Sequence, residues 1–358
     1  MHGGDVDAWA RSAGIEAGEI LDFSASINPL GPPRSARQAF VKSYGEISRY
    51  PDAYGETLKE TLAQRHGLHS TEVLLGNGST QLIYLLCAAL RPRKALIVGP
   101  AFSEYANALA LGGAHVQQIT LIEAAGFQFL TEQFMTAWDQ DCDIVFIATP
   151  NGATGQLIPK TAIETIARVA LTRKTFVVID EAFIDFVEVE SVKILVRENP
   201  YVIVLRSLTK YFALPGLRLG YLLAETRRVA RLAAYQEPWS INAPALRVAL
   251  ACLKDASFPL KTEHWLEQER RFFFAGLAAI EGLRPFASRA NFLLVKMDRD
   301  GSDAVQLGAF LSRKKILIRV CTSFAGLGGD YFRVAVKRRK DNLRLLAALK
   351  EWSVSSIA

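Results

Sequence analysis

Residues 206–221 read RSLTKYFALPGLRLGY and directly follow the apolar run Val202–Leu205, which predicts a buried strand that ends in a polar loop. In this loop Ser207 and Thr209 can donate hydroxyl hydrogen bonds to a phosphate, and Arg218 can add a bidentate charged contact. Lys210 can condense with an aldehyde once its amine has lost a proton. The stretch therefore predicts a site for a phosphorylated aldehyde cofactor at the carboxyl end of a strand.

A second apolar run ends in a carboxylate. Residues 176–183 read FVVIDEAF, which predicts a parallel strand with Asp180 at its carboxyl end, where open α/β sheets place their ligand contacts. Asp180 can pair with a protonated pyridine nitrogen, and a lysine beside fixed cations has its pKa lowered. The order of Asp180, the S-x-T-K run and Arg218 predicts a pyridoxal 5'-phosphate site with Lys210 and Asp180 as its catalytic residues.

Several further motifs accompany this order along nearly the whole chain: His2-Gly3-Gly4, LDFSASINPLG at 21–31, RYPD at 49–52, DEAFIDF at 180–186 and ILIR at 316–319. With them the chain resembles the fold-type I pyridoxal phosphate enzymes of the aspartate aminotransferase superfamily. Within that superfamily it is similar to the threonine-phosphate decarboxylases of cobalamin biosynthesis, which are close relatives of the histidinol-phosphate aminotransferases. The runs at 2–4, 21–31 and 180–186 indicate the decarboxylases.

The resemblance implies an activity and two alternatives. It implies decarboxylation of L-threonine O-3-phosphate to (R)-1-amino-2-propanol phosphate, with pyridoxal 5'-phosphate as cofactor and a homodimer with shared active sites. A histidinol-phosphate or related aminotransferase is the nearest alternative, because it shares the lysine, the aspartate and the arginines. A non-catalytic cofactor-binding regulator is a further alternative, although the chain lacks an appended helix-turn-helix domain.

The resemblance also implies the rest of the cofactor pocket. Gly78, Ser79 and Thr80 precede an apolar helix predicted over Gln81–Leu90, and a helix N-terminus attracts a phosphate. Phe102 occupies the position of the aromatic ring that stacks on the cofactor. Tyr50 resembles the tyrosine that the partner subunit lends to the cofactor site.

One segment departs from the family pattern. The usual Pro-Asn-Asn-Pro-Thr-Gly is here Pro150-Asn151-Gly152-Ala153-Thr154-Gly155, and Phe183 stands where aminotransferases often have tyrosine. The cofactor's phenolic oxygen would lose both usual donors, at a cost of about 1.5–3 kcal/mol, and would depend on the Schiff-base proton, on water or on a shifted Asn151. Phe183 in place of tyrosine favours the decarboxylase.

Two arginines define the expected substrate end of the site. Arg333 lies in an alternating strand and Arg319 ends another, and both match family positions that bind a substrate anion. His2, Gly3 and the loop from Ser24 to Asn28, with Asn28 itself, are implied as substrate contacts by the resemblance alone. Together these residues predict a site for a doubly negative, phosphorylated amino acid.

Composition limits the remaining possibilities. A chain of 358 residues with 50% hydrophobic content can bury one large core and a smaller lobe. It has no apolar run long enough for a membrane span and no signal-peptide pattern, which predicts a cytoplasmic enzyme without a membrane partner. Four widely spaced cysteines and scattered histidines predict reduced core thiols and no metal site.

A net charge of +6 and the run Lys337–Lys340 raise the question of nucleic-acid binding. The run lacks interleaved aromatic residues and falls between a predicted strand and a predicted helix, so we expect a solvated junction and no nucleic-acid partner. A positive field also attracts phosphorylated substrates.

The alternation of helical patterns with short apolar runs predicts an α/β fold with a mostly parallel sheet covered by helices on both faces. The predicted strands are 95–98, 116–119, 144–148, 176–179 and 202–205. We expect an N-terminal arm and active-site loop at 1–45 that joins the small domain, a large cofactor-binding domain at 46–255, and a small α+β domain at 256–358. In the small domain, strands are predicted at 291–296, 316–319 and 331–336.

Overall fold

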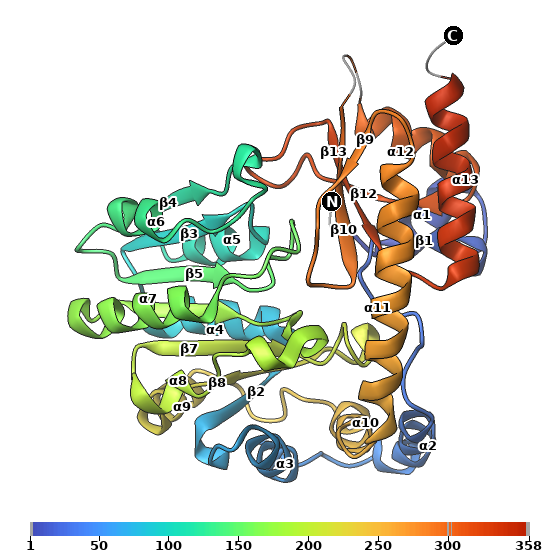
Figure 1. The fold of residues 1–358 in the computed structure, drawn as a ribbon. Helices are drawn as coiled ribbons and strands as arrows, with labels where there is room; N and C mark the ends of the chain where they lie inside the picture. Colours follow the sequence, from blue (N-terminus) through green and yellow to red (C-terminus); the bar gives the residue numbers. More distant parts are fainter. Residues whose placement is uncertain (1–2, 299–300, 302, 356–358) are drawn as a thin grey trace.

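A sheet of seven strands forms the centre of the larger part of the molecule (Figure 1). The computed structural model describes residues 3–298, 301 and 303–355. In spatial order the strands are β2 (Val73–Asn77), β8 (Leu219–Leu223), β7 (Val202–Ser207), β6 (Phe176–Asp180), β5 (Ile144–Ala148), β3 (Lys94–Gly99) and β4 (His115–Thr120). Only β8 runs antiparallel to its neighbours, so the predicted, mostly parallel sheet is confirmed. The sequence prediction missed β2 and β8.

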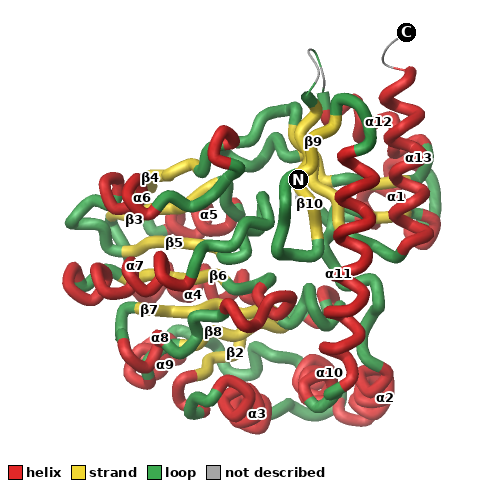
Figure 2. The backbone as a smooth tube through the Cα atoms, in the orientation of Figure 1, coloured by secondary structure: helices red, strands yellow, loops and turns green. Residues whose placement is uncertain are grey.

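Helices cover both faces of this sheet (Figure 2). In β5, Val145 and Ile147 face one hydrophobic core while Ile144 and Phe146 face the other, as the two-residue period of a strand requires. The first core includes side chains of α3 (Glu56–His66), α6 (Thr131–Ala137), α7 (Lys160–Arg173) and α8 (Leu195–Glu198). The second includes side chains of α4 (Gly78–Leu90), α5 (Ser103–Leu111) and α9 (Thr226–Ala233).

A smaller antiparallel sheet lies beyond the carboxyl ends of the central strands (Figure 1). Its order is β12 (Arg319–Val320), β13 (Tyr331–Ala335), β10 (Phe292–Met297) and β9 (Leu283–Pro285). Its helices are α11 (Ser257–Ala278), α12 (Ala304–Arg313) and α13 (Arg339–Ser355). In Figure 1, α11 runs from this sheet down to α10 (Ala243–Leu253) and so connects the two parts of the chain.

The single strand expected at 316–319 is two strands in different sheets. β11 (Ile316–Leu317) pairs in parallel with β1 (Leu21–Asp22), whereas β12 starts at Arg319 and pairs with β13. The chain changes partner at Ile318, so Arg319 belongs to the same small sheet as Arg333. The pairing with β1 depends on a segment almost 300 residues earlier in the chain, which no local pattern reveals.

The N-terminal arm serves both parts of the molecule. β1 pairs with β11, whereas α2 (Arg34–Ser43) packs along α10 (Figures 1 and 2). The first helix is α1 (Val6–Ala13), and the short 3-10 helices are at Ala17–Glu19, Tyr44–Glu46, Ser70–Glu72, Glu123–Ala125, Ile184–Glu190 and Pro215–Leu217. The arm therefore links the small sheet to the helices beside the large one.

The basic run at 337–340 is mostly exposed to solvent, although two of its arginines also contact other parts of the fold. Arg339 starts α13 and pairs with Glu269, and the Nε of Arg338 donates to the carbonyl of Pro29. Burial lowers the pKa of Lys337. The side chains of Arg338 and Arg339 thus contact other parts of the fold, and that of Lys337 is partly withdrawn from water. Within the described ranges, no helix has the length and apolar character that a membrane crossing requires.

Candidate functional site

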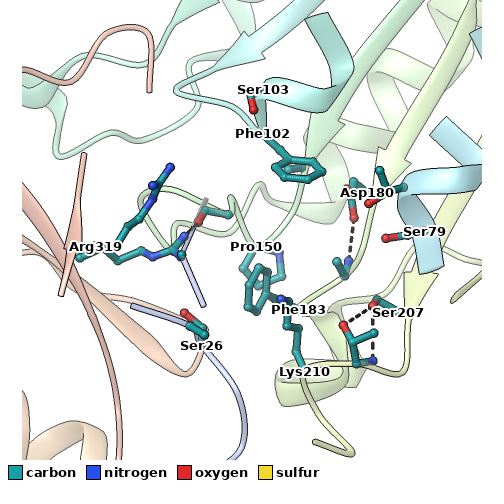
Figure 3. A pocket seen from close by; sticks show the side chains of 18 of the residues that line it. Ser26, Ser79, Phe102, Ser103, Pro150, Asp180, Phe183, Ser207, Lys210 and Arg319 are labelled. Atoms are coloured by element: carbon teal, nitrogen blue, oxygen red, sulfur yellow. Dashed lines mark hydrogen bonds between the residues drawn. The ribbon is translucent and has the colours of Figure 1, made fainter. Parts of the chain in front are cut away.

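A cavity of about 340 Å³ opens at the carboxyl ends of the central strands and reaches the small sheet. Figure 3 shows Ser79 and Ser207 at one end, Arg319 and Ser26 at the other, and Lys210 with two phenylalanine rings between them. The location is the one that parallel α/β sheets favour for ligands, because polar residues at several strand ends meet there.

The first end of the cavity is built to hold an anion. Ser79 and Thr80 lie in the first turn of α4, whose N-terminus carries partial positive charge, and both line the cavity. Asn77 is the N-cap residue, so the two hydroxyls are not used for capping. The Ser207 and Thr209 hydroxyls lie 2.8 Å apart on the facing loop. This arrangement presents hydroxyl and amide donors to one point.

Glycines allow this end of the cavity to close tightly. Gly78 has a φ of +76°, and a Cβ there would lie 2.5 Å from an Nη2 atom of Arg218. A Cβ on Gly220 would lie 2.4 Å from the backbone nitrogen of Ser79. Glycine at both positions lets the β8 backbone approach the helix N-terminus and lets Arg218 reach the cavity.

Lys210 lies between the two ends of the cavity. Burial, and then the charges of Arg333 and Arg218, lower the pKa of its amine from 10.5 to about 8, against the opposing charge of Asp180. The Lys210 carbonyl accepts a hydrogen bond from the backbone amide of Asn28, which fixes the backbone at Lys210. About a tenth of the amine is therefore unprotonated and nucleophilic at pH 7, a far larger share than at the ordinary pKa of 10.5.

Asp180 is buried at the end of β6, beside Lys210. Its Oδ2 accepts a hydrogen bond of 2.5 Å from the Tyr105 hydroxyl, and its Oδ1 accepts one of 2.9 Å from the Ala182 amide. Burial raises the pKa of this carboxyl, while the two hydrogen bonds and the charge of Lys210 oppose the rise. The site can thus hold a carboxylate ready to pair with a cationic ring nitrogen.

A buried ion pair ties together the strands that carry these residues. Arg206 Nη1 donates to Glu181 Oε2 at 3.0 Å, and both side chains are fully buried. Glu181 directly follows Asp180, the last residue of β6, and Arg206 directly precedes Ser207, the last residue of β7. The pair therefore fixes Asp180 relative to the loop that carries Lys210.

Two aromatic rings form the walls. Phe102 and Phe183 both line the cavity, and Figure 3 shows their rings on either side of its centre. A Cβ on Gly152 would lie 3.7 Å from Phe183, an ordinary contact, so the missing side chain leaves usable space there. A flat aromatic group fits between such walls.

The second end is cationic. Arg333 Nη1 donates to the Gly152 carbonyl, and Nη2 lies 3.5 Å from the Ser24 carbonyl. Burial lowers the pKa of Arg333 to about 10, and no carboxylate of the described ranges forms an ion pair with it. Arg319 Nη2 donates to Ser323 Oγ at 2.6 Å. A positive charge that is partly withdrawn from water and bonded to backbone carbonyls is a good receptor for an anion.

Several expected contacts lie elsewhere. The side-chain amide of Asn28 donates to the Tyr211 carbonyl and to Thr262 Oγ1. The side-chain nitrogen of Asn151 donates to the Pro100 carbonyl, and its side-chain oxygen accepts from two backbone amides. Both asparagines are buried supports of the walls and do not line the cavity. Tyr50 is exposed and stacks on Trp239, with ring centroids 4.7 Å apart, outside this protomer's cavity. Gly3 lines the cavity, and His2 falls outside the described residues.

Ser24 and Ser26, which belong to the loop expected from the resemblance, line the cavity, whereas sequence reasoning missed three polar lining residues: Ser103, Tyr105 and Ser323. Tyr105 is one turn after Phe102 on α5, and its partner Asp180 is 75 residues away, so only the fold brings them together. Cysteines do not contribute a metal site: all four are free and buried, and the described residues hold no cluster of acidic, histidine or cysteine side chains suited to a metal.

The residues present fit the cofactor that the resemblance implies. Pyridoxal 5'-phosphate needs a phosphate cup, a lysine, a carboxylate for its ring nitrogen and flat walls. The glycine-lined cup beside Arg218, the nucleophilic Lys210, buried Asp180 and the ring of Phe102 supply these.

Comparison with known proteins agrees with the geometry. Residues 18–349 match the family described as aminotransferase class I and II. Threonine-phosphate decarboxylase of Salmonella typhimurium is 40% identical over 98% of this chain and 95% of its own length. The histidinol-phosphate aminotransferase structure from Clostridium acetobutylicum has a TM-score of 0.88 at 31% identity, covering 94% of this chain and 100% of that one. The L-threonine-O-3-phosphate decarboxylase structure from Porphyromonas gingivalis has a TM-score of 0.82 at 25% identity, covering 93% and 99%. The similarity spans both sheets and the cavity between them.

Proposed function

The chain belongs to the aminotransferase class I and II family, and from this premise we propose that it decarboxylates L-threonine O-3-phosphate with pyridoxal 5'-phosphate as cofactor. The products are carbon dioxide and (R)-1-amino-2-propanol phosphate. The similarity to threonine-phosphate decarboxylase of Salmonella typhimurium over nearly the full length of both chains supports this substrate. By the same resemblance, the product serves cobalamin biosynthesis.

The observation that carries the proposal is the cationic end of the cavity. Arg333 has no acidic partner within the described ranges, and Arg319 lies beside it in the same small sheet. Two guanidinium groups match a phosphate dianion better than a single carboxylate. A phosphorylated amino acid is therefore the substrate class that this site fits.

The residues around Lys210 have separate tasks. Bound pyridoxal phosphate supplies an electron-accepting ring for the chemistry at the substrate Cα. Asp180, kept in place by Tyr105, holds negative charge opposite the ring nitrogen. Ser79, Thr80, Ser207, Thr209 and Arg218 hold the cofactor phosphate. Lys210 would hold the aldehyde group of the cofactor, and its amine would carry the proton that is delivered to the substrate Cα.

The distribution of cations explains which group leaves. Arg218 belongs to the cofactor cup, and Arg319 with Arg333 binds the substrate phosphate. No other arginine lines this cavity within the described ranges, so the substrate carboxylate has no guanidinium of its own. The carboxylate departs as carbon dioxide, and the proton from Lys210 takes its place on Cα.

A histidinol-phosphate aminotransferase is the second candidate, because such an enzyme from Clostridium acetobutylicum has the same fold at 31% identity. It would need the same cofactor cup and the same phosphate-binding arginines. Gly152 and Phe183, which provide no polar side-chain group to the cofactor's phenolic oxygen, favour the decarboxylase.

Parallel product analysis separates the two candidates. We expect the cofactor-loaded protein to convert L-threonine O-3-phosphate to aminopropanol phosphate without 2-oxoglutarate. Glutamate formation from 2-oxoglutarate with histidinol phosphate as donor, at a higher kcat/KM, would replace the proposal with the aminotransferase.

We also propose that the enzyme is a cytoplasmic homodimer in which Tyr50 completes the partner's site. The exposed apolar residues Phe40, Val41, Tyr44, Ile47 and Tyr50 gather on the N-terminal segment and support a contact between copies. Four free, buried cysteines suit a reducing compartment. Sedimentation equilibrium should give twice the protomer mass of 39.5 kDa, and a monomer with full activity would contradict the shared site.

A further inference from the structure

The turn after β4 carries a carboxylate that reaches across to the small sheet (Figure 1). Glu123 Oε2 lies 2.9 Å from Lys296 Nζ, and the same carboxylate accepts hydrogen bonds from Arg284 and from the Tyr331 hydroxyl. Arg284 lies on β9, Lys296 on β10 and Tyr331 on β13. One side chain beside the edge of the large sheet therefore binds three strands of the small sheet.

The three donors form a row across the small sheet. Lys296 is paired with Arg284 on one side and with Tyr331 on the other, so the three side chains share one face. Arg333 follows two residues after Tyr331 on β13, which places it on that same face, and its partner on β12 is Arg319. The face held by the carboxylate is thus the face that presents both arginines to the cavity.

An aromatic contact strengthens the same junction. Phe127, whose amide donates to the Ile122 carbonyl, has a φ of +59°, a left-handed conformation that is strained for an aromatic residue. Its ring is buried and packs edge-on against Phe286 and Tyr331, with centroids 5.0 and 6.1 Å away. Such strain persists only where the surroundings fix it, so the small sheet holds this turn in one conformation, with Glu123 facing its partners.

A second contact joins β4 to the loop between β12 and β13. Gln118 Nε2 donates to the Ala325 carbonyl at 3.3 Å. A Cβ on Gly326 would collide with the Thr120 side chain, so glycine allows the loop to lie directly against the strand. Phe324 of the same loop lines the cavity. The edge of the large sheet therefore contacts both the strands and the loop that form the cationic end of the site.

Glu123 supplies the charge that links the two sheets. Lys296 also forms ion pairs with Asp298 and Asp330, and Arg284 Nε donates to Asp298 at 2.6 Å, but these aspartates directly flank β10 and β13. Burial opposes ionisation of Glu123, yet the hydrogen bonds from its three partners lower its pKa to about 2. Neutralising this carboxylate would cut the link between the sheets and leave the ion pairs within the small sheet in place.

We propose that Glu123 is a positioning residue that holds the small sheet against the large one and thereby sets where Arg319 and Arg333 meet the substrate anion. The proposal rests on the function proposed above. It assigns no contact with the substrate to Glu123, which does not line the cavity. Without this carboxylate the small sheet is free to shift, and a displacement of a guanidinium group by about 1 Å weakens its hydrogen bonds to an anion.

The test is Glu123→Gln in the cofactor-loaded enzyme, with Asp298→Asn as the matched control. Both carboxylates bind Arg284 and Lys296, and each replacement removes one charge, but only Glu123 bridges the sheets. The cofactor occupies the phosphate cup, so inorganic phosphate reports on the arginine end. In Glu123→Gln we expect the dissociation constant of phosphate, measured by calorimetry, and the KM of threonine phosphate to rise about three- to tenfold, with kcat nearly unchanged. Asp298→Asn should leave both constants unchanged.

Tyr331→Phe tests the same contact from the small sheet. It removes the hydroxyl that donates to Glu123 and keeps the ring that packs on Phe127. Because both replacements break one contact, the double variant should bind phosphate no more weakly than Glu123→Gln alone. Losses that add in the double variant would show that the two residues act separately and would overturn the proposal.

An unchanged dissociation constant for phosphate in Glu123→Gln, or an equal rise in Asp298→Asn, would also overturn it, whatever happens to the Tm. Calorimetry requires no turnover, so the result is separable from the proposed function. If the wild-type enzyme failed to decarboxylate threonine phosphate while Glu123→Gln still weakened phosphate binding, the positioning role would stand and the assigned reaction would not.

Discussion

Replacing Lys210 by alanine is expected to lower kcat for threonine phosphate about 10²- to 10⁴-fold, the usual contribution of a positioned acid–base group. The variant loses both the amine that bonds the cofactor and the proton donor for Cα, whereas Asp180 and the phosphate cup remain. Carbon dioxide release by the cofactor-loaded variant measures the effect. Lys261→Ala, which removes an exposed lysine bonded to Ser257 on α11, is the control and should be fully active. A Lys210 variant with more than a tenth of the wild-type kcat would contradict the assignment.

The pH dependence of cofactor uptake follows from the same lysine. Burial and the charges of Arg333 and Arg218 lower its pKa from 10.5 to about 8, so the reactive free amine predominates above that pH. The rate at which cofactor-free protein takes up pyridoxal phosphate, followed by visible absorbance, should rise with pH and level off just above 8. A rate that keeps rising towards 10.5 would show that the amine is not perturbed.

Replacing Arg333 by glutamine is expected to have the second large effect. Removing one partner of a desolvated charge pair costs about 2–5 kcal/mol, which corresponds to a fall of roughly 30- to 5,000-fold in kcat/KM. Phosphate inhibition should weaken in parallel, since the same guanidinium binds the anion. The pH at which cofactor uptake levels off should also increase, because Arg333 is one of the cations that lower the pKa of Lys210.

Arg270→Gln is a matched control for this variant. Arg270 is partly buried, donates to the Ala290 carbonyl at 3.3 Å and, like Arg333, has its pKa lowered by burial, but it does not line the cavity. The control should leave phosphate inhibition unchanged. Equal effects of the two replacements on KM would indicate that Arg333 acts through the fold and not on the substrate anion.

Most of the large sheet could be predicted because its strands are continuous apolar runs. Five predicted segments coincide with β3 to β7, and the two strands missed, β2 and β8, each have a glycine inside the strand, Gly76 and Gly220. Glycine is unusual in a strand, but Gly220 is needed where β8 passes the backbone of Ser79. The division of residues 316–319 between two sheets depends on pairing with Leu21–Asp22, which is a tertiary contact.

The residues of the candidate site also fall into two groups, those that the sequence indicated and those that only the fold brings together. Lys210, Asp180, Arg218 and the paired hydroxyls follow strand ends at fixed spacing, so the sequence alone indicated them, and the structure brings them around one cavity. Asn28 was expected as a substrate contact from the resemblance alone, but its side-chain amide instead donates to the Tyr211 carbonyl. Tyr105 had no signal, because its importance depends on the distant carboxylate that the fold places beside it.

The most direct test of the central claim is the amount of carbon dioxide released per molecule of L-threonine O-3-phosphate, labelled in its carboxyl carbon and supplied without 2-oxoglutarate. One carbon dioxide is expected for each substrate molecule consumed, with an equal amount of aminopropanol phosphate. Retention of the label in a non-volatile product, with consumption that depends on added 2-oxoglutarate, would contradict it and identify an aminotransferase.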